Sequence, residues 1–326
     1  MKASDTVQLG RTNVTVTRLG LGTAPLSGLY RPVADADAQD ALEAAWRLGI
    51  RFYDTAPVYG HGLGEMRTGR ALRDKPRGDY ALGTKVGRLL RADAPPEAGQ
   101  IFFGTPPVNP RFDFSYDGVM RSFEESRERL GIERVDILHI HDSDDHFDEA
   151  LSGAYAALDR LRSEGVISAV GSGMNQAEML SEFARRADFD CFLLAGRYTL
   201  LDQAGLKELL PLCVERGIAI IAAGVYNSGI LADPKAGAKF NYRDAPGALV
   251  DRARRIAAVC ERHGVPLRAA AVQFPLGHPA VHTVLVGSRT SEEVEDSVRN
   301  FETPIPPELW ADLKRERLLP EEAPTP

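Results

Sequence analysis

Short apolar runs and longer amphipathic segments alternate along this chain. Eight runs of five to seven residues are almost continuously apolar, as buried parallel strands are, and they cover residues 17–23, 50–54, 80–85, 135–141, 167–172, 191–196, 218–223 and 282–287. Segments with apolar residues at helical spacing separate them, and four of these segments end on a glycine, which commonly caps a helix: 37–49, 116–131, 151–165 and 206–217. Eight strands that alternate with helices predict a closed (β/α)8 barrel, the TIM-barrel fold.

The same pattern predicts what closes and covers this barrel. The segments "VQLG" and "VTVT" flank the turn Arg11-Thr12-Asn13 and predict an N-terminal β-hairpin that plugs the bottom of the barrel. Residues 89–115, after the third strand, are rich in proline, glycine and phenylalanine, and so long a loop is expected to form a lid or a wall of a binding site. Two helices are expected between the seventh and eighth strands. Residues 1–326 are expected to form one domain.

Side chains capable of proton transfer stand where three of the strands end. Asp54, Lys85 and His141 close the second, third and fourth runs, and Tyr59 lies five residues after Asp54 in the loop "TAPVYGHG". Active sites of parallel barrels form at the carboxyl ends of the strands, so these four residues are expected on one rim. A phenol, an ammonium, a carboxylate and an imidazole can together move a proton at a reacting oxygen.

Composition narrows the function classes. The chain is 44% hydrophobic and 26% charged, with a net charge of −7 and no basic run, which argues against nucleic acid or an anionic membrane surface as a partner. The start, "MKASDTVQ", has no signal-peptide core, and the longest apolar stretches are too short to span a bilayer. Three cysteines without metal spacing suggest free thiols, no metal site and a cytoplasmic location. A monomer or a homodimer is expected.

These motifs, placed on their strands, resemble the aldo-keto reductase family. "FYDTAPVYGHGLGEMRTGRAL" is similar to the family's Asp-x4-Tyr segment, Thr84-Lys85 to its lysine strand, and "VDILHIHD" puts His141, rather than His139, at its histidine. "GIAIIAAGVYNSGILAD" and "VGSRTSEEVEDSV" resemble its two cofactor loops. Each motif alone is weak, but their common order covers nearly the whole chain. More narrowly, "GLYRPV", "GTPPVNPRFDFSYDGVMRS" and "HIHDSDDH" resemble the sugar 1-dehydrogenase branch, and pyridoxal 4-dehydrogenase is similar in the same regions.

The resemblance implies roles for the four rim residues. Tyr59 would exchange a proton with the substrate oxygen, and Lys85 would lower the pKa of that phenol. Asp54 would pair with Lys85 and hold it charged, while His141 would orient the substrate by hydrogen bonding. For an aldose, the C1 hydroxyl of the cyclic hemiacetal would lose its proton to Tyr59, its hydride would pass to the nicotinamide, and a lactone would remain.

Each of these residues also has an ordinary structural interpretation. Asp54 caps a turn, Tyr59 packs half-buried, Lys85 is a solvated charge at a strand end, and His141 is one of three nearby histidines with His139 and His146. Their joint placement on one rim favours catalysis.

The cofactor is expected in the loops after the seventh and eighth strands, since no Gly-x-Gly-x-x-Gly opens a helix after the first strand. Backbone N–H groups of Ser228, Gly229 and Ile230 would bind the pyrophosphate; alternatively, Gly224 and Gly229 only permit turns. Many family members place an aromatic ring where this chain has Ala223, and Gly173-Met174 replaces the usual Ser-Asn pair, with Asn175 one place later. The residues expected to contact the cofactor are Gly22, Thr23, Asp54, Asn175, Ala223, Ser228, Gly229, Leu231, Gly287, Ser288, Arg289 and Glu293.

The choice between NAD and NADP depends on the last loop. NADP-dependent relatives tend to carry a basic residue at the position of Glu293, and a carboxylate there would repel a 2′-phosphate, so NAD is favoured. Two observations leave NADP open: Thr290 and Glu293 also fit a helix-capping box, and Arg289 offers a positive charge to a phosphate.

The substrate is expected against the long loop. Tyr59, His141 and Asp142 would contact it inside walls formed by Leu29, Tyr30, Phe102, Phe103, Phe112 and Phe114, although these rings could instead be core packing and Asp142 a solvated charge. The leading hypothesis is an NAD(P)-dependent aldose 1-dehydrogenase. The alternatives are a pyridoxal dehydrogenase or general aldehyde reductase of the same family and, less favoured, a nucleotide-binding regulatory subunit.

Overall fold

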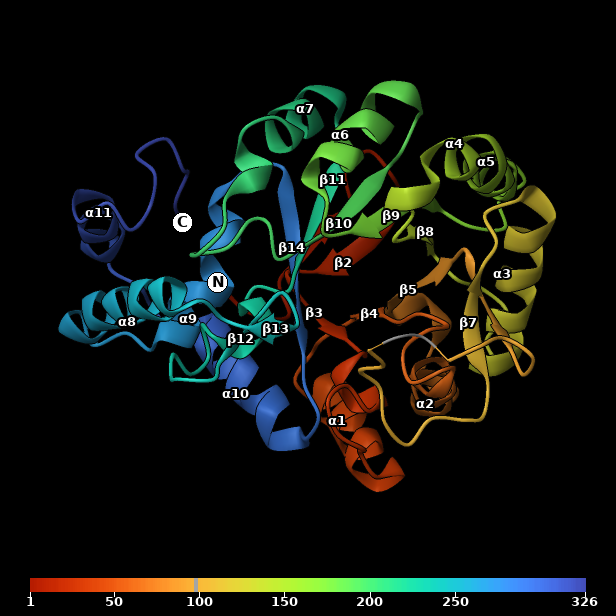
Figure 1. Ribbon diagram of the computed structural model, residues 1–326, viewed down its shortest axis with the longest axis horizontal. Coiled ribbons are helices and arrows are strands. Elements are labelled where there is room, and N and C mark those ends of the chain that lie inside the picture. The colour runs from red at the N-terminus through yellow and green to blue at the C-terminus, as the bar shows by residue number, and fades with distance from the viewer. Residues whose placement is uncertain (97–98) are drawn as a thin grey trace.

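A closed barrel of eight parallel strands lies at the centre of the molecule (Figure 1). The computed structural model describes residues 1–96 and 99–326. The barrel strands are β3 (Leu19–Gly22), β4 (Phe52–Asp54), β5 (Ala81–Val86), β8 (Ile137–His141), β9 (Ala169–Met174), β10 (Cys191–Ala195), β11 (Ala219–Ala223) and β14 (Val281–Gly287). Every one of the eight apolar runs supplies one strand, so the predicted (β/α)8 barrel is confirmed.

Helices surround the strands, because each apolar strand needs cover on its outer face. The main helices are α1 (Asp35–Arg47), α2 (Leu63–Leu72), α3 (Tyr116–Leu130), α5 (Tyr155–Ser163), α6 (Ala177–Arg186), α7 (Leu209–Arg216), α8 (Gly247–Arg262), α9 (Leu267–Gln273), α10 (Ser291–Glu302) and α11 (Pro307–Arg315), with a short α4 (Phe147–Glu149). The α8 and α9 pair confirms the two helices expected between the last strands. The end of α3 illustrates the glycine cap: Gly131 has φ +61° and its N–H donates to the Arg127 carbonyl.

The N-terminal hairpin closes the bottom of the barrel as predicted. Strands β1 (Thr6–Gln8) and β2 (Thr15–Thr17) are antiparallel. The hairpin residues Leu9, Val14 and Val16 are buried in one cluster with interior residues of the strands, among them Phe52 and Ile137. This apolar layer keeps water out of the lower barrel and leaves the opposite end for polar chemistry.

The long segment after β5 was expected to be a loop, but part of it forms a two-stranded β-ribbon. Strands β6 (Arg88–Arg91) and β7 (Asn109–Phe112) pair antiparallel into a ribbon, and residues 97 and 98 of the segment lie outside the described residues. In the connection between β6 and β7, Phe102 forms an isolated bridge with Leu29, and the Phe103 N–H donates to the Gly28 carbonyl. The ribbon segment is thereby fastened to the loop after β3, next to the barrel mouth.

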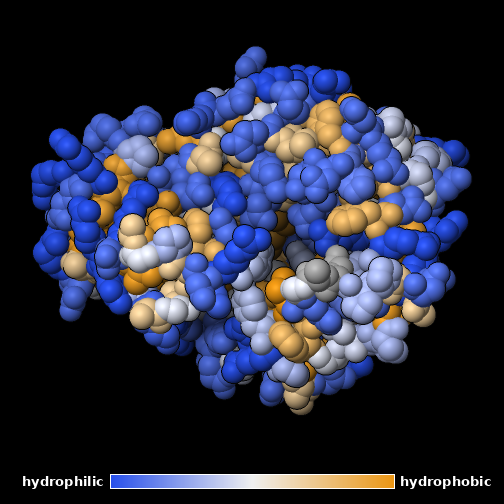
Figure 2. Space-filling view, in the orientation of Figure 1, coloured by the Kyte–Doolittle hydropathy of each residue, from blue (hydrophilic) through white to orange (hydrophobic). Residues whose placement is uncertain are grey.

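A second insertion follows β11 and reaches the same end of the barrel. It contains a two-stranded hairpin, β12 (Lys239–Phe240) and β13 (Arg243–Asp244), before α8 begins. Figure 2, in the orientation of Figure 1, shows the surface hollowed near the centre of this face. Among the described residues, no helix has the length and apolarity to cross a bilayer, and no cluster of three metal-ligating side chains is found.

Candidate active site

The barrel mouth contains a buried ion pair between two neighbouring strands. Asp54 ends β4 and Lys85 lies on β5, so their side chains enter the barrel side by side. The Lys85 Nζ lies 2.5 Å from Asp54 Oδ2 and also donates to the Thr55 carbonyl at 2.8 Å. Both side chains are nearly inaccessible to water, at 1% and 3% exposure. The pairing expected from the sequence is therefore present, and Lys85 is not a solvated charge.

Tyr59 and His141 complete the group. The Lys85 Nζ lies 4.8 Å from the centre of the Tyr59 ring, and the edge of the His141 ring meets Tyr59 at a centroid distance of 5.9 Å. Tyr59 remains partly exposed, whereas the other three residues are buried. Gly60, with φ +60°, turns the loop directly after Tyr59, where a Cβ atom would collide with the Ser27 carbonyl oxygen. The structure thus brings all four predicted residues together on one rim.

Burial controls the proton affinities of this group. Loss of water raises the pKa of the Asp54 carboxyl, and the Lys85 charge opposes the rise. Burial also raises the pKa of Tyr59 well above its usual value, and the Asp54 and Asp142 carboxylates raise it further. The pKa of Tyr59 is raised although Lys85 lies near its ring, because the ammonium is paired with Asp54 and a buried phenolate lacks solvation. The lowering expected from Lys85 stays a prediction. Tyr59 is therefore a neutral proton donor in this state.

The imidazole of His141 is neutral for the same reason. Burial lowers its pKa well below the usual value, and the positive charges of Arg88 and Lys85 lower it further. Its Nε2 lies 3.5 Å from Asp142 Oδ2, and Arg88 holds that carboxylate with a 2.8 Å hydrogen bond. Arg88 also lies over the Phe112 ring, 4.7 Å from its centre. The ribbon thus supplies a charged group and an aromatic ring to the rim beside His141.

The aromatic wall differs in part from the expectation. Phe102 lies 6.1 Å from the Tyr59 ring, and Phe103, Phe112 and Tyr30 are exposed. Phe114 is completely buried, because it fills the space beside Gly87 beneath the ribbon and packs against Phe112 at 5.8 Å. Phe114 is therefore a packing residue and not a wall of the substrate site.

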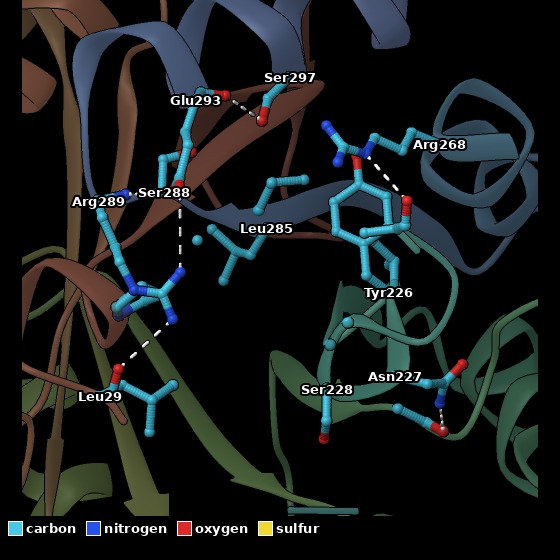
Figure 3. Close-up of a pocket in the computed structure, with 18 of the residues that line it drawn as sticks. Leu29, Tyr226, Asn227, Ser228, Arg268, Leu285, Ser288, Arg289, Glu293 and Ser297 are labelled. Atoms are coloured by element: carbon cyan, nitrogen blue, oxygen red, sulfur yellow. Dashed lines mark hydrogen bonds and ion pairs between the residues drawn. The ribbon is translucent and has the colours of Figure 1, made fainter. Parts of the chain in front are cut away.

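A cavity of about 640 Å³ lies at the same end of the barrel, between the loops after β11 and β14 (Figure 3). None of the four rim residues is part of its lining. Its size is in the range of small-molecule and cofactor sites. In Figure 3, Arg289 and Arg268 stand on opposite sides of it, with Leu285 between them in this view. Seven of the expected cofactor residues line it: Asn175, Ser228, Gly229, Gly287, Ser288, Arg289 and Glu293. Tyr30, expected at the substrate, lines it too.

The remaining expected contacts lie elsewhere. Gly22, Thr23, Asp54 and Ala223 are not part of the cavity lining, although they lie at the same strand ends. Leu231 is completely buried in the core. The N–H of Gly229 already donates to the Tyr226 carbonyl at 2.9 Å, so it is not free to bind a pyrophosphate as expected.

Glu293 combines both roles considered for it. Its N–H donates to the Thr290 hydroxyl, and its carboxylate accepts a 2.7 Å hydrogen bond from the Arg289 N–H, so it stabilises the start of α10. Its side chain remains 42% exposed and lines the cavity. Glu293 therefore caps α10 and at the same time places a negative charge in the cavity.

Some cavity residues are not foreseeable from sequence spacing. Arg268 comes from α9 and is held by Asp296 of α10 at 2.9 Å, and Asn241 and Tyr242 come from the tip of the β12–β13 hairpin. The backbone marks only the turn itself: Asn241 and Tyr242 have positive φ values, +50° and +64°, as a two-residue hairpin turn requires. That this hairpin tip lines the cavity is decided by tertiary packing alone.

The cavity fits a nucleotide in its chemistry. It presents the guanidinium groups of Arg268 and Arg289, and the Ser288 hydroxyl is buried without a hydrogen-bond partner within the protein. Cationic and hydroxyl donors of this kind bind phosphate and ribose oxygens. An ionisable group at the barrel mouth and a cavity with these donors at the same end of the barrel suit a nucleotide-dependent oxidoreductase.

Comparison with known proteins identifies the family. Residues 18–316 match the model of the aldo/keto reductase family. The chain is 46% identical to a pyridoxal 4-dehydrogenase from Microbacterium luteolum, covering 98% of this chain and 99% of that protein. It is 42% identical to a D-threo-aldose 1-dehydrogenase from a Pseudomonas species, covering 94% and 96%. A solved aldo-keto reductase structure from Bacillus halodurans superposes with a TM-score of 0.75 at 26% identity, covering 96% of each chain. The chain belongs to the aldo-keto reductase family and is an NAD(P)-dependent oxidoreductase.

Proposed function

We propose that this enzyme oxidises the cyclic hemiacetal of an aldose at C1 to a lactone, with NAD as the hydride acceptor. The observation that carries the proposal is the meeting of Tyr59, His141 and the Lys85–Asp54 pair at the barrel mouth, at the same end of the barrel as the nucleotide-sized cavity. The bound nicotinamide supplies hydride transfer. The protein supplies alignment of the C1–H bond and a place for the hydroxyl proton.

Tyr59 is the residue that exchanges the proton. It is the member of the group that keeps partial exposure at the rim, so we place the substrate oxygen against its side chain. Neutral His141 donates or accepts one hydrogen bond and directs that oxygen toward the phenol. Because burial keeps Tyr59 protonated, it is ready as the acid for carbonyl reduction. In the oxidative direction, Tyr59 would first release its proton to solvent at the mouth, and the phenolate would then take the C1 hydroxyl proton while the C1 hydride passes to NAD and the lactone carbonyl forms.

The nucleotide would lie along the cavity with its phosphates toward the cationic side chains. Arg289, Arg268 and the Ser288 hydroxyl are the groups that suit phosphate and ribose oxygens. The Glu293 carboxylate faces the same space and would repel a 2′-phosphate, which favours NAD over NADP.

The rim favours a small polyhydroxylated substrate. Asp142 and His141 offer hydrogen-bonding groups on one side, and the exposed side chain of Phe112 offers apolar surface nearby. This combination suits a sugar ring, which has polar edges and apolar C–H faces. The likeness to a D-threo-aldose 1-dehydrogenase supports the same substrate class.

A second candidate substrate is pyridoxal, favoured by the 46% identity to a pyridoxal 4-dehydrogenase. Pyridoxal carries a hydroxymethyl group beside its aldehyde and can close to a hemiacetal, so the same proton and hydride steps apply. Its aromatic ring would use the Phe112 side of the rim more than the hydroxyl-binding side.

The deciding experiment is a panel assay with purified protein. L-fucose, D-arabinose, L-galactose and pyridoxal are each combined with NAD and with NADP, and the reduced nicotinamide is followed by its absorbance. Turnover of an aldose with NAD, with the lactone identified as product, supports the first proposal; turnover of pyridoxal alone supports the second. Loss of activity in Tyr59→Phe, against the control Tyr80→Phe, tests the phenol. Absence of turnover with every pair, despite nucleotide binding, would overturn both substrate assignments.

A further inference from the structure

The β6–β7 ribbon places an arginine at the edge of the barrel mouth. Gly87, with φ +99°, turns the chain after β5, and Arg88 is the first residue of β6. Arg88 pairs across the ribbon with Phe112, whose ring centre lies 4.7 Å from the guanidinium carbon. The Arg88 side chain is only 15% exposed. A guanidinium packed on a ring and shielded from water is held in one place, so Arg88 brings a positioned charge to the mouth.

Asp142 connects this charge to His141. Side chains of consecutive strand residues point to opposite faces, but β8 ends at His141 and Asp142 has φ +44°, so the chain leaves the strand there. The Asp142 N–H donates to the Gly173 carbonyl at 3.0 Å, which anchors the turn on β9. The turn allows Oδ2 of Asp142 to lie 2.8 Å from Arg88 Nη2 and 3.5 Å from His141 Nε2. The arginine and the imidazole therefore share one carboxylate oxygen.

The shared oxygen affects where the imidazole carries its proton. A neutral histidine has its proton on either ring nitrogen, and the group facing each nitrogen decides between them. The negative charge of Asp142, 3.5 Å from Nε2, favours a proton on that nitrogen. Asp142 is 34% exposed, so Nε2 lies on the side of the His141 ring that borders the mouth. In this form the imidazole is a hydrogen-bond donor toward the mouth.

Arg88 balances the charge of Asp142 at both groups that meet the substrate. A carboxylate this close would by itself raise the pKa of an imidazole. The pKa of His141 is instead held well below its usual value, by burial and next by the Arg88 charge. Burial and the neighbouring carboxylates raise the pKa of Tyr59, and Arg88 is the cation that opposes them.

We propose that Arg88 is a positioning residue: by pairing with Asp142, it keeps His141 neutral and protonated on Nε2, the form that donates a hydrogen bond to the substrate oxygen. The inference rests on the proposed function, in which His141 orients that oxygen and Tyr59 exchanges its proton. A purely structural role, in which the Arg88–Asp142 pair only fastens the ribbon to the loop after β8, predicts a loss of stability without any change in the state of His141.

Charged and titratable groups face His141 from several elements. From β9, its strand partner is Gly173, which brings no charge. The groups are Lys85 of β5, Arg88 of β6, His139 of β8, Asp142 after β8, Tyr59 after β4 and, acting with Asp142, Tyr242 of the β12–β13 hairpin. Changing Arg88 or Asp142 alters the charge beside the imidazole and leaves the Lys85–Asp54 pair and the phenol in place.

The first test observes the imidazole directly and needs no substrate. Nitrogen-15 chemical shifts of histidine rings distinguish a proton on Nδ1 from one on Nε2 and report when the ring becomes charged. The His141 signals are identified among those of the seven histidines by their loss in His141→Gln. In the parent protein we expect a neutral ring with its proton on Nε2 between about pH 6 and about pH 8.

Arg88→Met and Asp142→Asn should move this titration in opposite directions. Without Arg88, the Asp142 carboxylate remains beside the imidazole, so His141 should take up a proton at a pH about one unit higher. Without the Asp142 charge, Arg88 acts alone, so His141 should stay neutral to lower pH, with part of its proton moved to Nδ1. The double variant removes both charges and should return the titration close to that of the parent protein.

Arg91→Met is the matched control. Arg91 lies on the same strand and also holds a carboxylate, that of Glu125 on α3, at 2.9 Å. Its loss should lower stability and leave His141 and turnover unchanged. Arg88→Lys keeps a positive charge near Asp142 without the planar fork and should retain most of the parent behaviour. Circular dichroism verifies the fold of each variant, and if Arg88→Met does not fold, the opposite shift in Asp142→Asn still tests the proposal.

The second test uses the substrate that the panel assay identifies. Oxidation needs a neutral His141 and a deprotonated Tyr59, and Arg88 lowers the pKa of both groups. In Arg88→Met, the acidic limb of the pH profile of kcat should therefore move up by about one pH unit, with kcat about tenfold lower near pH 7. In Asp142→Asn, the same limb should move to lower pH.

The outcomes separate this proposal from the proposed function. A His141 ring that carries its proton on Nδ1 in the parent protein overturns the proposal, as does an identical His141 titration in the parent protein and Arg88→Met. A loss of stability in Arg88→Met with an unchanged pH profile also overturns it. If no aldose or pyridoxal is turned over, the proposed function fails, but the nitrogen-15 titration still decides whether Arg88 controls His141.

Discussion

Lys85 and Asp54 form an ion pair, 2.5 Å between Nζ and Oδ2, that is almost completely removed from water. A pair of this kind is expensive to break from one side, since the remaining charge is left buried without a partner. The pair therefore has two roles: it is proposed to assist Tyr59 in catalysis, and it stabilises the fold at the barrel mouth.

Asp54→Asn should lower both stability and activity. The buried Lys85 ammonium loses its counter-charge, so the free energy of unfolding is expected to fall by about 3–5 kcal/mol, measured by urea denaturation. The double variant Asp54→Leu with Lys85→Met should regain much of that stability while remaining inactive. Full stability in Asp54→Asn would mean that the pair contributes nothing to the fold.

Gly87→Ala should loosen the ribbon at its origin. Gly87 links β5 to β6 with φ +99°, and an added Cβ atom would collide with the buried Phe114 ring. The combined backbone and packing cost is expected to be about 2–4 kcal/mol in the free energy of unfolding. Gly99→Ala is the control, because Gly99 has φ +76° with open space around it and carries the backbone cost alone. Equal losses in the two variants would contradict the packing role of Phe114.

Glu293→Gln should shift the cofactor preference toward NADP. The amide keeps an acceptor for the Arg289 N–H but removes the negative charge from the cavity. We expect the ratio of kcat/KM for NADP over NAD to rise by roughly tenfold, about 1.4 kcal/mol. Glu295→Gln, whose carboxylate pairs with Arg47 outside the cavity, should leave the ratio unchanged. A parent enzyme that already prefers NADP would refute the role given to Glu293.

The two buried histidines should make the protein less stable in mild acid. Burial holds the pKa values of His139 and His141 well below the usual 6.5, whereas the unfolded chain takes up protons near that pH. As the pH falls below about 6.5, the free energy of unfolding should therefore decrease by up to about 1.4 kcal/mol per pH unit for each histidine. His139→Leu should reduce this slope, measured by urea denaturation at several pH values between about 5 and 7. An unchanged slope would mean that His139 is protonated in the folded protein.

Much of the fold and the four rim residues could be predicted because they depend on local patterns. Strands buried on both faces are continuously apolar wherever they occur, and the carboxyl ends of parallel strands must meet at one rim. Asp54, Lys85 and His141 end consecutive strands of this kind, so their proximity follows from the order of the strands.

The sequence by itself therefore determined the barrel, its hairpin plug and the candidate tetrad. Only the tertiary structure decided which groups are desolvated and which hydrogen bonds are already used. It raised the pKa of Tyr59, buried Phe114 beneath the β6–β7 ribbon and engaged the Gly229 N–H with Tyr226. It also brought Arg268 into the cavity from a distant helix. These properties depend on contacts between residues far apart in the chain, and no local periodicity encodes the solvent accessibility that such contacts leave.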